Sequence, residues 1–481
     1  MENKLIYDIT DRPKFGQMLI FAIQQVLAIL AATIAVPAII GLPARMPSAI
    51  LGAGVGTLVY QFFTKRRSPV FLGSSFAFLG SLSVAIAYGY CGIVLGSVVA
   101  ALVYVVIAIA VRFTGTGWVD KLMPPVIIGP TVAIIGLSLA PNAMGDIVKA
   151  NSSVSFSDYN LAALCCGLVA FFVIVICSTQ RKYKMARLIP FIIGIGAGYA
   201  VAALMTAIGY LCSIDYLMII DFKPLVDNFV AANGEFKGLS AFFEFPGIAF
   251  VDGIKELISG NVSSEIISAN ANAKVIDLGG VAEVVIAFLP VALVVFAEHI
   301  ADHKNLSSII NKDLIKDPGL DRTLLGDGVG SFLGTAFGIC PNTTYGESVG
   351  CIAVTRNASI STITTASVMC IILSFIRPVM ALLQTIPSCV MGGVCLTLYG
   401  FIAVSGLRMF KEVDLNKEKN LFVIASILIS GIGGLIIKIP YAFEGGAISK
   451  YVTITSIATA LIIGIVTNTI LSKVESKQEK E

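Results

Sequence analysis

The stretch Cys340-Pro341-Asn342-Thr343-Thr344-Tyr345-Gly346-Glu347-Ser348-Val349-Gly350 interrupts a long run of apolar sequence. It combines a proline, two glycines, several hydroxyls and a carboxylate, from which an unbroken spanning helix would gain nothing. Backbone leaves the helix at membrane depth only where it is buried in protein or lines a cavity. A carboxylate at the centre of a spanning helix costs ~2.5–3.5 kcal/mol. The stretch therefore predicts a broken transmembrane segment that builds a small-molecule site.

The composition predicts an all-α polytopic membrane protein. Of 481 residues, 56% are hydrophobic and only 13% are charged, and long apolar runs recur along the whole chain. A net charge of +3 without a long basic stripe argues against a nucleic-acid partner. The ten cysteines form no CxxC pair, and in apolar segments they act as small hydrophobes, so we expect no metal site.

Hydropathy predicts fourteen membrane segments, of which 69–88 and 341–355 are irregular. The predicted ranges are 15–40, 48–63, 69–88, 91–113, 122–140, 160–178, 187–212, 281–301, 323–338, 341–355, 360–377, 386–407, 420–438 and 451–472.

Charge in the connecting segments predicts the topology. With both termini cytoplasmic, 24 of the 33 lysine and arginine residues fall in cytoplasmic segments. This bias is what the positive-inside rule requires. The first apolar run is too long for a cleaved signal peptide, so we expect a retained helix and a multi-pass protein of a bacterial plasma membrane.

The moderately polar segment 213–280, which we expect outside the cell, divides the chain into halves of seven segments, 1–212 and 281–481. An odd number per half makes the second half enter the membrane with opposite orientation, which is typical of an inverted repeat. The fifth segments agree, because Pro124–Gly129 and Pro387–Gly392 both place a proline five residues before a glycine. The alternative is that glycine and proline are simply common in membrane helices.

Six ionisable residues at membrane depth fall within the first three segments of the second half. They are Glu298, His299, Asp302, His303, Asp327 and Glu347. Such clustering marks a binding site or pathway. Glu298 and Asp302 are four residues apart and share one helix face. Two carboxyl groups in one dry cavity cannot easily both be ionised, so such a pair can hold a proton, which is the physical basis of proton-coupled transport.

The predicted site offers hydrogen-bond acceptors and donors. Carboxylates accept, and amide N–H groups near Phe76 and Gly346, at helix N-termini in the two broken segments, donate. This combination suits a flat ligand with alternating N–H and C=O groups. Phe76, Tyr345 and Tyr399 are aromatic residues that can cover its faces.

Each of these residues also has a structural interpretation. Glu298 can be a buried group bonded to hydroxyls, and Asp302 a solvated residue at a helix end. Asp327 lies in Leu325-Gly326-Asp327-Gly328 and can fix a helix end. For His299 and His303 we favour a surface or packing role.

With these residues the chain strongly resembles the nucleobase–ascorbate transporter family, and within it the uracil-transporting bacterial members. The resemblance covers nearly all of the sequence. Its motifs are Gly73–Phe78, Ala297–Ile300, Lys312–Leu314, Pro318–Leu320 and Pro341–Glu347, followed by Gly350, Thr355 and Arg356.

The resemblance implies fourteen segments in two inverted repeats of seven, with short strands in the third and tenth. It implies a core domain made of 15–113 and 281–377 and a gate domain made of 122–212 and 386–472. It also suggests a homodimer, which the residues themselves do not indicate.

The resemblance implies that Glu298 and Glu347 bind the substrate. It places amide donors at Phe76 and Gly346. It assigns pocket positions to Ala32, Tyr345 and Tyr399. The expected function is uracil import by proton symport without a cofactor, the proton being shared by Glu298, Glu347 and Asp302.

Three positions depart from the family pattern. Asp302 and Gln25 stand where a histidine is common, and Ser348 where asparagine is usual, so the proton route stays open. Glu347 matches the uracil branch, since purine-selective members tend to carry glutamine there. A xanthine or urate symporter is the alternative. An anion channel would need cationic groups in this acidic site, and an enzyme would need a nucleophile paired with a base.

Overall fold

The computed structural model describes residues 5–150, 159–180, 182–183, 186–187, 189–231, 234–444 and 447–478. Within these ranges nine helices are long and apolar enough to cross a bilayer. The chain is thus a mostly helical, multi-pass membrane protein. Residues 1–4 and 479–481, which carry part of the predicted cytoplasmic charge, lie outside the described residues.

The first half consists of helices that follow the predicted apolar runs. Helices α6 and α9 begin at prolines, which have no N–H to leave unpaired in the first turn. The elements are α1 (Phe15–Ile39), α2 (Met46–Phe63), β1 (Leu72–Ser74), α3 (Leu79–Ala85), α4 (Gly89–Thr114), α5 (Gly117–Leu122), α6 (Pro125–Ile147), α7 (Leu161–Thr179) and α9 (Pro190–Cys212).

The second half follows the predicted segments except that α13 continues nine residues past the predicted end at 301 and the segments 420–438 and 451–472 differ at their ends. Its elements are α13 (Leu278–Ile310), α14 (Leu320–Phe337), β2 (Asn342–Thr344), α15 (Gly346–Thr355), α16 (Ile360–Ser374), α17 (Arg377–Gln384), α18 (Ser388–Arg408), α19 (Glu418–Ile432), β3 (Ile437–Glu444), β4 (Ala447–Ile454) and α20 (Ser456–Gln478).

Four predicted segments contain helices that fall short of a full apolar span. Helices α15, α16 and α19 have 10, 15 and 15 residues. Helix α14 has 18 residues and carries Asp321, Arg322 and Asp327. Length and charge therefore account for four of the five predicted segments that are not separate long apolar helices. The fifth difference arises because the helical chain from Phe76 to Thr114 is continuous and covers the predicted segments 69–88 and 91–113.

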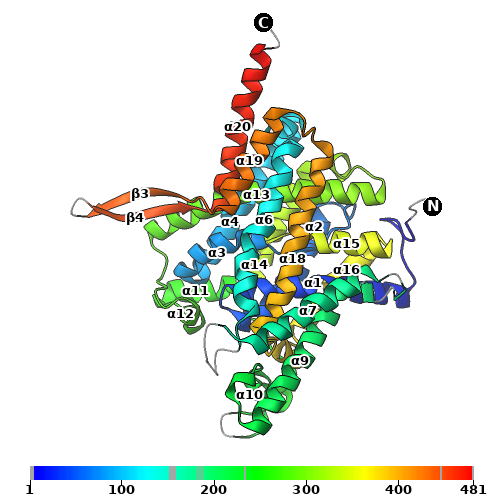
Figure 1. Ribbon diagram of the computed structural model, residues 1–481, viewed down its shortest axis with the longest axis vertical. Helices are drawn as coiled ribbons and strands as arrows, with labels where there is room; N and C mark the ends of the chain where they lie inside the picture. Colours follow the sequence, from blue (N-terminus) through cyan, green and yellow to red (C-terminus); the bar gives the residue numbers. More distant parts are fainter. Residues whose placement is uncertain are drawn as a thin grey trace.

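The sequence does not predict the hairpin β3–β4. The predicted end of the segment 420–438 lies too late in the sequence, and the predicted start of the segment 451–472 lies too early. Helix α19 ends at Ile432, and α20 begins only at Ser456. Gly434, with φ of 71°, follows the end of α19. Ile437, Lys438 and Ile439 then alternate apolar and polar, which is the period of a strand. Figure 1 shows the hairpin extending away from the helices.

The connecting segment 213–280 is folded onto the helices. It contains α10 (Lys223–Phe229), α11 (Ala249–Ser259) and α12 (Ser264–Ala269). Arg45, which precedes α2, pairs with Asp252 of α11 at 2.8 Å and with Glu265 of α12 at 2.7 Å. Its guanidinium also lies 4.5 Å from the centroid of the Tyr90 ring. These contacts attach the segment to the ends of α2 and α4.

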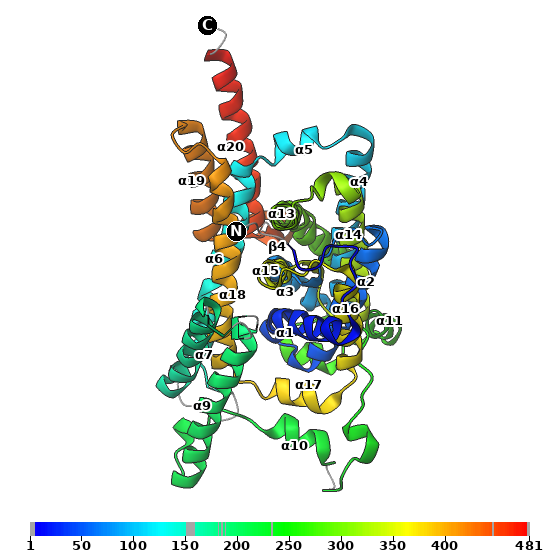
Figure 2. The same ribbon diagram turned by 90° about the vertical axis from the view of Figure 1, so that its right-hand side faces the viewer.

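The helices form two groups that lie side by side (Figure 2). One group contains α6, α7, α9, α18, α19 and α20, and the other is built around α1, α2, α4, α13, α14 and α16. Each group joins both halves of the chain. A Cβ at Gly52 of α2 would lie 2.1 Å from the Gly334 carbonyl of α14, and one at Gly136 of α6 would lie 2.1 Å from the Tyr399 carbonyl of α18. Glycine is therefore needed for these close helix approaches.

Candidate functional site

Two short strands from opposite halves cross in the interior. Strands β1 and β2 are antiparallel, with Leu72 opposite Thr344 and Ser74 opposite Asn342. The Ser75 N–H donates to the Pro341 carbonyl at 2.8 Å and extends the pairing. Each strand satisfies backbone groups of the other, which lipid cannot do. Both interrupted segments thus contain a strand, as the family resemblance implies.

Tyr345 lies against this strand crossing. Its hydroxyl donates to the Ser74 carbonyl at 2.8 Å, and only 3% of the residue is exposed. A Cβ at Gly73 would lie 2.3 Å from Tyr345 Cε2, so the ring occupies the space above that glycine. Tyr345 therefore supports the strand pair, and its contact with a ligand stays a prediction.

A helix begins directly after each strand. Helix α15 begins at Gly346 behind the extended residue Tyr345, and a short 3₁₀ helix, Phe76–Phe78, precedes α3. The first N–H groups of a helix have no intrahelical partner. Gly346 is exposed, and a Cβ there would meet only Asp302 Oδ1, at 3.8 Å. The N-terminus of α15 therefore opens onto free space beside Asp302.

Three carboxyl groups predicted for the site converge here. Asp302 of α13 accepts a hydrogen bond from Thr344 Oγ1 of β2 at 2.7 Å. Glu298 lies one turn earlier on α13 and interacts electrostatically with Asp302, with Glu347 of α15 and with Asp327 of α14. Within the described residues, the buried Glu298 Oε2 has no hydrogen-bond partner. The site therefore has an acceptor that is unused by the protein.

The aromatic residues predicted for the pocket link the two helix groups. Phe76 and Tyr399 of α18 make an edge-to-face contact with ring centroids 5.4 Å apart. Both are nearly fully buried. Ala32 is fully buried in α1, and α1 packs against both β1 and α15. The fold thus places the predicted pocket residues on the elements that surround the crossing.

Two of the departures from the family pattern contact each other. Gln25 Nε2 of α1 donates to Ser348 Oγ of α15 at 2.5 Å. The Gln25 carbonyl oxygen is buried and has no hydrogen-bond partner among the described residues. Gln25 therefore holds α15 against α1 and leaves one acceptor in the interior.

The two histidines and Asp327 do not lie at the surface, which rules out the surface role considered for the histidines and leaves the packing role open. All three are fully buried, and His299 Nδ1 lies 2.7 Å from Asp327 Oδ2. The other ring nitrogen of His299 lies 3.0 Å from Thr323 Oγ1. One feature of the sequence points to this cluster. The chain has only two histidines, and both lie in the same apolar segment, four positions apart.

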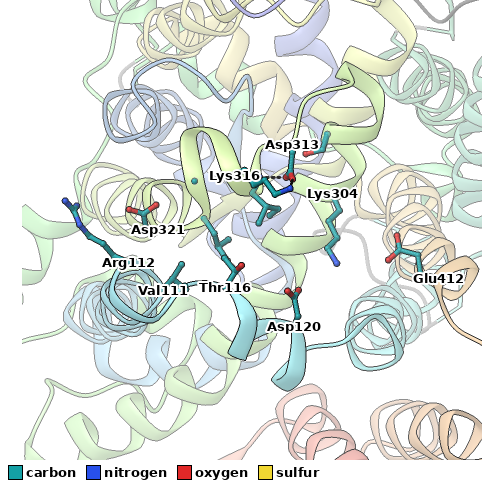
Figure 3. Close-up of a pocket in the computed structure, with 14 residues that line it drawn as sticks. Val111, Arg112, Thr116, Asp120, Lys304, Asp313, Lys316, Asp321 and Glu412 are labelled. Carbon is teal, nitrogen blue, oxygen red and sulfur yellow. Dashed lines mark hydrogen bonds and ion pairs between the residues drawn. The ribbon is translucent and has the colours of Figure 1, made fainter.

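A cavity of about 770 Å³ lies near the C-terminal end of α13 (Figure 3). Basic residues Arg112 of α4 and Lys304 of α13 line it, and acidic Asp120 of α5 and Glu412 also face it. Its lining does not include Glu298 or Glu347. It is therefore a polar cavity separate from the predicted site residues.

Two interrupted helical segments meet through paired strands, beside a buried acidic cluster. This arrangement defines a membrane permease. The sequence profile of the permease family matches residues 16–224 and 279–439. The chain belongs to this family, the nucleobase–ascorbate transporters, as its motifs predict.

Relatives of known name agree. A uracil permease of Bacillus caldolyticus is 35% identical over 475 residues, which are 98% of this chain and 95% of that protein. A uracil permease of Bacillus subtilis is 32% identical over 480 residues, 99% of this chain and 98% of that protein. The uracil permease of Escherichia coli K12 is 31% identical over 95% of this chain and 94% of its own length. These relatives are transporters, which agrees with the prediction that the protein is not an enzyme.

Solved structures with low identity show the same fold. The murine anion transporter Slc26a9 in its inward-facing state has a TM-score of 0.60 at 12% identity, covering 97% of this chain and 69% of that chain. The transmembrane domain of a cyanobacterium bicarbonate transporter, BicA, has a TM-score of 0.52 at 13% identity, covering 96% of this chain and 100% of that domain.

Proposed function

We propose that the protein imports uracil by proton symport across a bacterial plasma membrane. The observation that carries the proposal is the convergence of Glu298, Asp302 and Glu347 at the open N-terminus of α15. The uracil permeases that match over nearly the whole chain support uracil as the substrate. They do not favour the xanthine or urate alternative.

In the proposed site, the ring N–H groups of uracil donate to Glu298 and Glu347. The carbonyl oxygens of uracil accept from the backbone amides of Phe76 and Gly346. Helix N-termini suit acceptor groups because their first N–H groups are free and the helix dipole is positive there. The free Oε2 of Glu298 and the open space beside Gly346 support this arrangement.

In the proposed coupling step, a proton resides on one of Glu298, Asp302 and Glu347. Carboxyl groups this close in a dry interior cannot all be ionised, so at least one favours its protonated form. A bound pyrimidine that donates to two of them changes which one holds the proton. No cofactor takes part in this step.

We propose that movement of the two helix groups against each other carries the substrate across the membrane. The group around α13 and α14 is then the core (15–113 and 281–377), and the group around α6 and α18 is the gate (122–212 and 386–472). The contact between Phe76 and Tyr399 lies between them. The fourteen-segment inverted repeat is part of this proposal and is supported by strands at corresponding positions in the two halves.

The proposed topology places both termini in the cytoplasm. Arg112 comes from one segment predicted to be cytoplasmic, and Lys304 and Lys316 come from another, and all three line one cavity. Their common location supports the alternation of segments on which the prediction depends. A homodimer also remains a proposal, and cross-linking in membranes tests it.

Uptake of radiolabelled uracil into proteoliposomes, with and without an imposed proton gradient, tests the function. We expect accumulation only when the outside is acidic, and uracil should carry protons inward. Unlabelled xanthine and urate should compete weakly, because buried polar groups left without partners discriminate strongly between ligands. Equal accumulation without the gradient would exclude proton symport.

A further inference from the structure

The two histidines of the chain lie face to face in the interior of the core. The ring centroids of His299 and His303 are 4.1 Å apart with an interplanar angle of 28°. Both residues are 0% exposed. A positive charge on one ring opposes a positive charge on the other at this distance, so the pair holds at most one additional proton.

His303 is connected to a chain of hydroxyl groups. Its Nε2 lies 2.8 Å from the hydroxyl of Tyr60 in α2, and that hydroxyl lies 2.8 Å from Ser68 Oγ. Tyr60 and Ser68 are both 0% exposed. Ser68 directly follows the exposed residues Lys65, Arg66 and Arg67. The chain of polar groups therefore runs from the stacked histidines to a surface loop.

The hydrogen bonds define the form of neutral His303. Its Nδ1 lies 2.8 Å from the His299 carbonyl, which can only accept, so Nδ1 carries a hydrogen. In the neutral ring Nε2 is then an acceptor, and the single hydroxyl hydrogen of Tyr60 points to it. In the oriented 2.8 Å contact the Tyr60 hydroxyl donates to Ser68 Oγ, so this neutral arrangement requires the Ser68 hydrogen to turn toward the Tyr60 oxygen.

A second arrangement of the same groups contains one more proton. If Tyr60 donates to Ser68 instead, His303 Nε2 must carry a hydrogen and donate to Tyr60, so the ring is an imidazolium. The two arrangements are related by a shift of hydrogens along the chain. A proton from solvent beside the exposed residues Lys65–Arg67 reaches the buried Ser68 hydroxyl, the Ser68 hydrogen passes to Tyr60, and the Tyr60 hydrogen passes to Nε2. Only O–H and N–H bonds change.

The surroundings of the histidine pair are acidic. Among the described residues, Arg45 is the one buried arginine or lysine, and it is paired with Asp252 and Glu265. In the part of the chain that the structure describes, no ion pair of a lysine or arginine includes Glu298, Asp302, Asp327 or Glu347. The titratable groups in contact with the pair are Asp327 of α14, Tyr104 of α4 and Tyr60 of α2. Glu298 and Asp302 of α13 interact electrostatically with Asp327 and with Glu347 of α15.

We propose that His303 is a proton-binding residue loaded from the loop Thr64–Ser68 through Ser68 and Tyr60, and that its charge balances the carboxyl cluster while substrate is bound. This inference rests on the proposed proton symport. His303 acts on the site through its field, since His299 separates it from Asp327. It is therefore a positioning residue and not a substrate ligand.

The test uses full-length protein in proteoliposomes and the variants Tyr60→Phe, His303→Gln and Ser68→Ala. Uracil counterflow without a gradient reports binding and movement of the carrier. A trapped pH dye reports uracil-driven proton uptake. Tyr199→Phe is the matched control, because it also removes a tyrosine hydroxyl with a 2.8 Å hydrogen bond, to Thr385, outside this chain of groups.

We expect Tyr60→Phe and His303→Gln to keep counterflow, while the rate of uracil-driven proton uptake falls by about 10²-fold, the lower end of what a positioned proton-transfer group contributes. Ser68→Ala should show the same separation, and Tyr199→Phe should resemble the wild type. Wild-type proton uptake in Tyr60→Phe and His303→Gln would overturn the inference but leave the symport proposal intact. Equal loss of counterflow and proton uptake in all three variants would indicate a structural role and overturn it too. Counterflow without proton uptake in the wild type would overturn both proposals.

Discussion

Replacing Glu298 by glutamine should weaken uracil binding strongly while leaving the fold intact. The side chain keeps its size, and Oε2 makes no hydrogen bond within the described residues, so the substitution breaks no protein contact there. What is lost is a charge-assisted hydrogen bond to the ligand, worth about 1.5–3 kcal/mol. At 1.4 kcal/mol per factor of ten, the dissociation constant should rise by about 10- to 150-fold.

The assay is equilibrium binding of radiolabelled uracil to purified protein in detergent, with the midpoint of thermal unfolding measured on the same samples. Glu283→Gln is the matched control on the same helix. Glu283 accepts a hydrogen bond from the Tyr88 hydroxyl near the start of α13, far along the helix from the site. Its substitution should leave uracil affinity unchanged. Glu298→Ala should reduce binding below detection.

The reasoning depends on the charge of Glu298 facing the ligand. Wild-type affinity in Glu298→Gln would show that uracil does not bind this carboxylate. A large loss of thermal stability in the same variant would show that Glu298 holds the core together instead.

Three further outcomes are expected. Glu347→Gln should reduce uracil uptake at least about tenfold by losing a second charge-assisted hydrogen bond, and normal uptake at normal membrane levels would refute its role. Gly73→Ala should lower stability by about 1–3 kcal/mol, because its Cβ would lie 2.3 Å from Tyr345 Cε2, and an unchanged unfolding midpoint would contradict the packing. Partial burial raises the pKa of Asp8. The effect of burial is smaller than the combined lowering by the Lys312 hydrogen bond, a backbone N–H hydrogen bond and the Lys312 charge, so the pKa of Asp8 lies below 3.8. This lowered pKa contributes stability above pH 3.8 that is lost as the pH falls through the pKa of the folded state. Asp8→Asn should therefore reduce the loss of stability at acid pH by at most about 1 kcal/mol. Identical profiles of stability against pH for the variant and the wild type would contradict this expectation.

Most helices could be predicted from the sequence because hydropathy is a local property. The apolar runs that begin near Phe15 and Ser388 each form one helix within two residues of the prediction, and the run near Pro125 forms one helix that ends seven residues later than predicted. The hairpin β3–β4 was missed because a short alternating pattern between two apolar runs is a weak signal beside them. The charged and polar residues of α14 also weaken its apolar pattern in the sequence.

The residues of the candidate site could be named from the sequence, because charges and helix breakers at membrane depth are costly and therefore rare. Their partners could not. Asp302 meets Thr344, and Gln25 meets Ser348 across 323 positions of the chain. The hydrogen bond between His303 and Tyr60 was also missed, because it joins α13 to α2.

The sequence by itself determined where the chain is apolar enough to form membrane helices, where those helices break, and which few residues carry charge inside them. Only the tertiary structure decided that β1 pairs with β2, that three carboxyl groups share one space, and that both histidines stack beside them. The physical reason is that helix formation in lipid depends on neighbouring residues, whereas strand pairing and charge clustering depend on how distant helices pack.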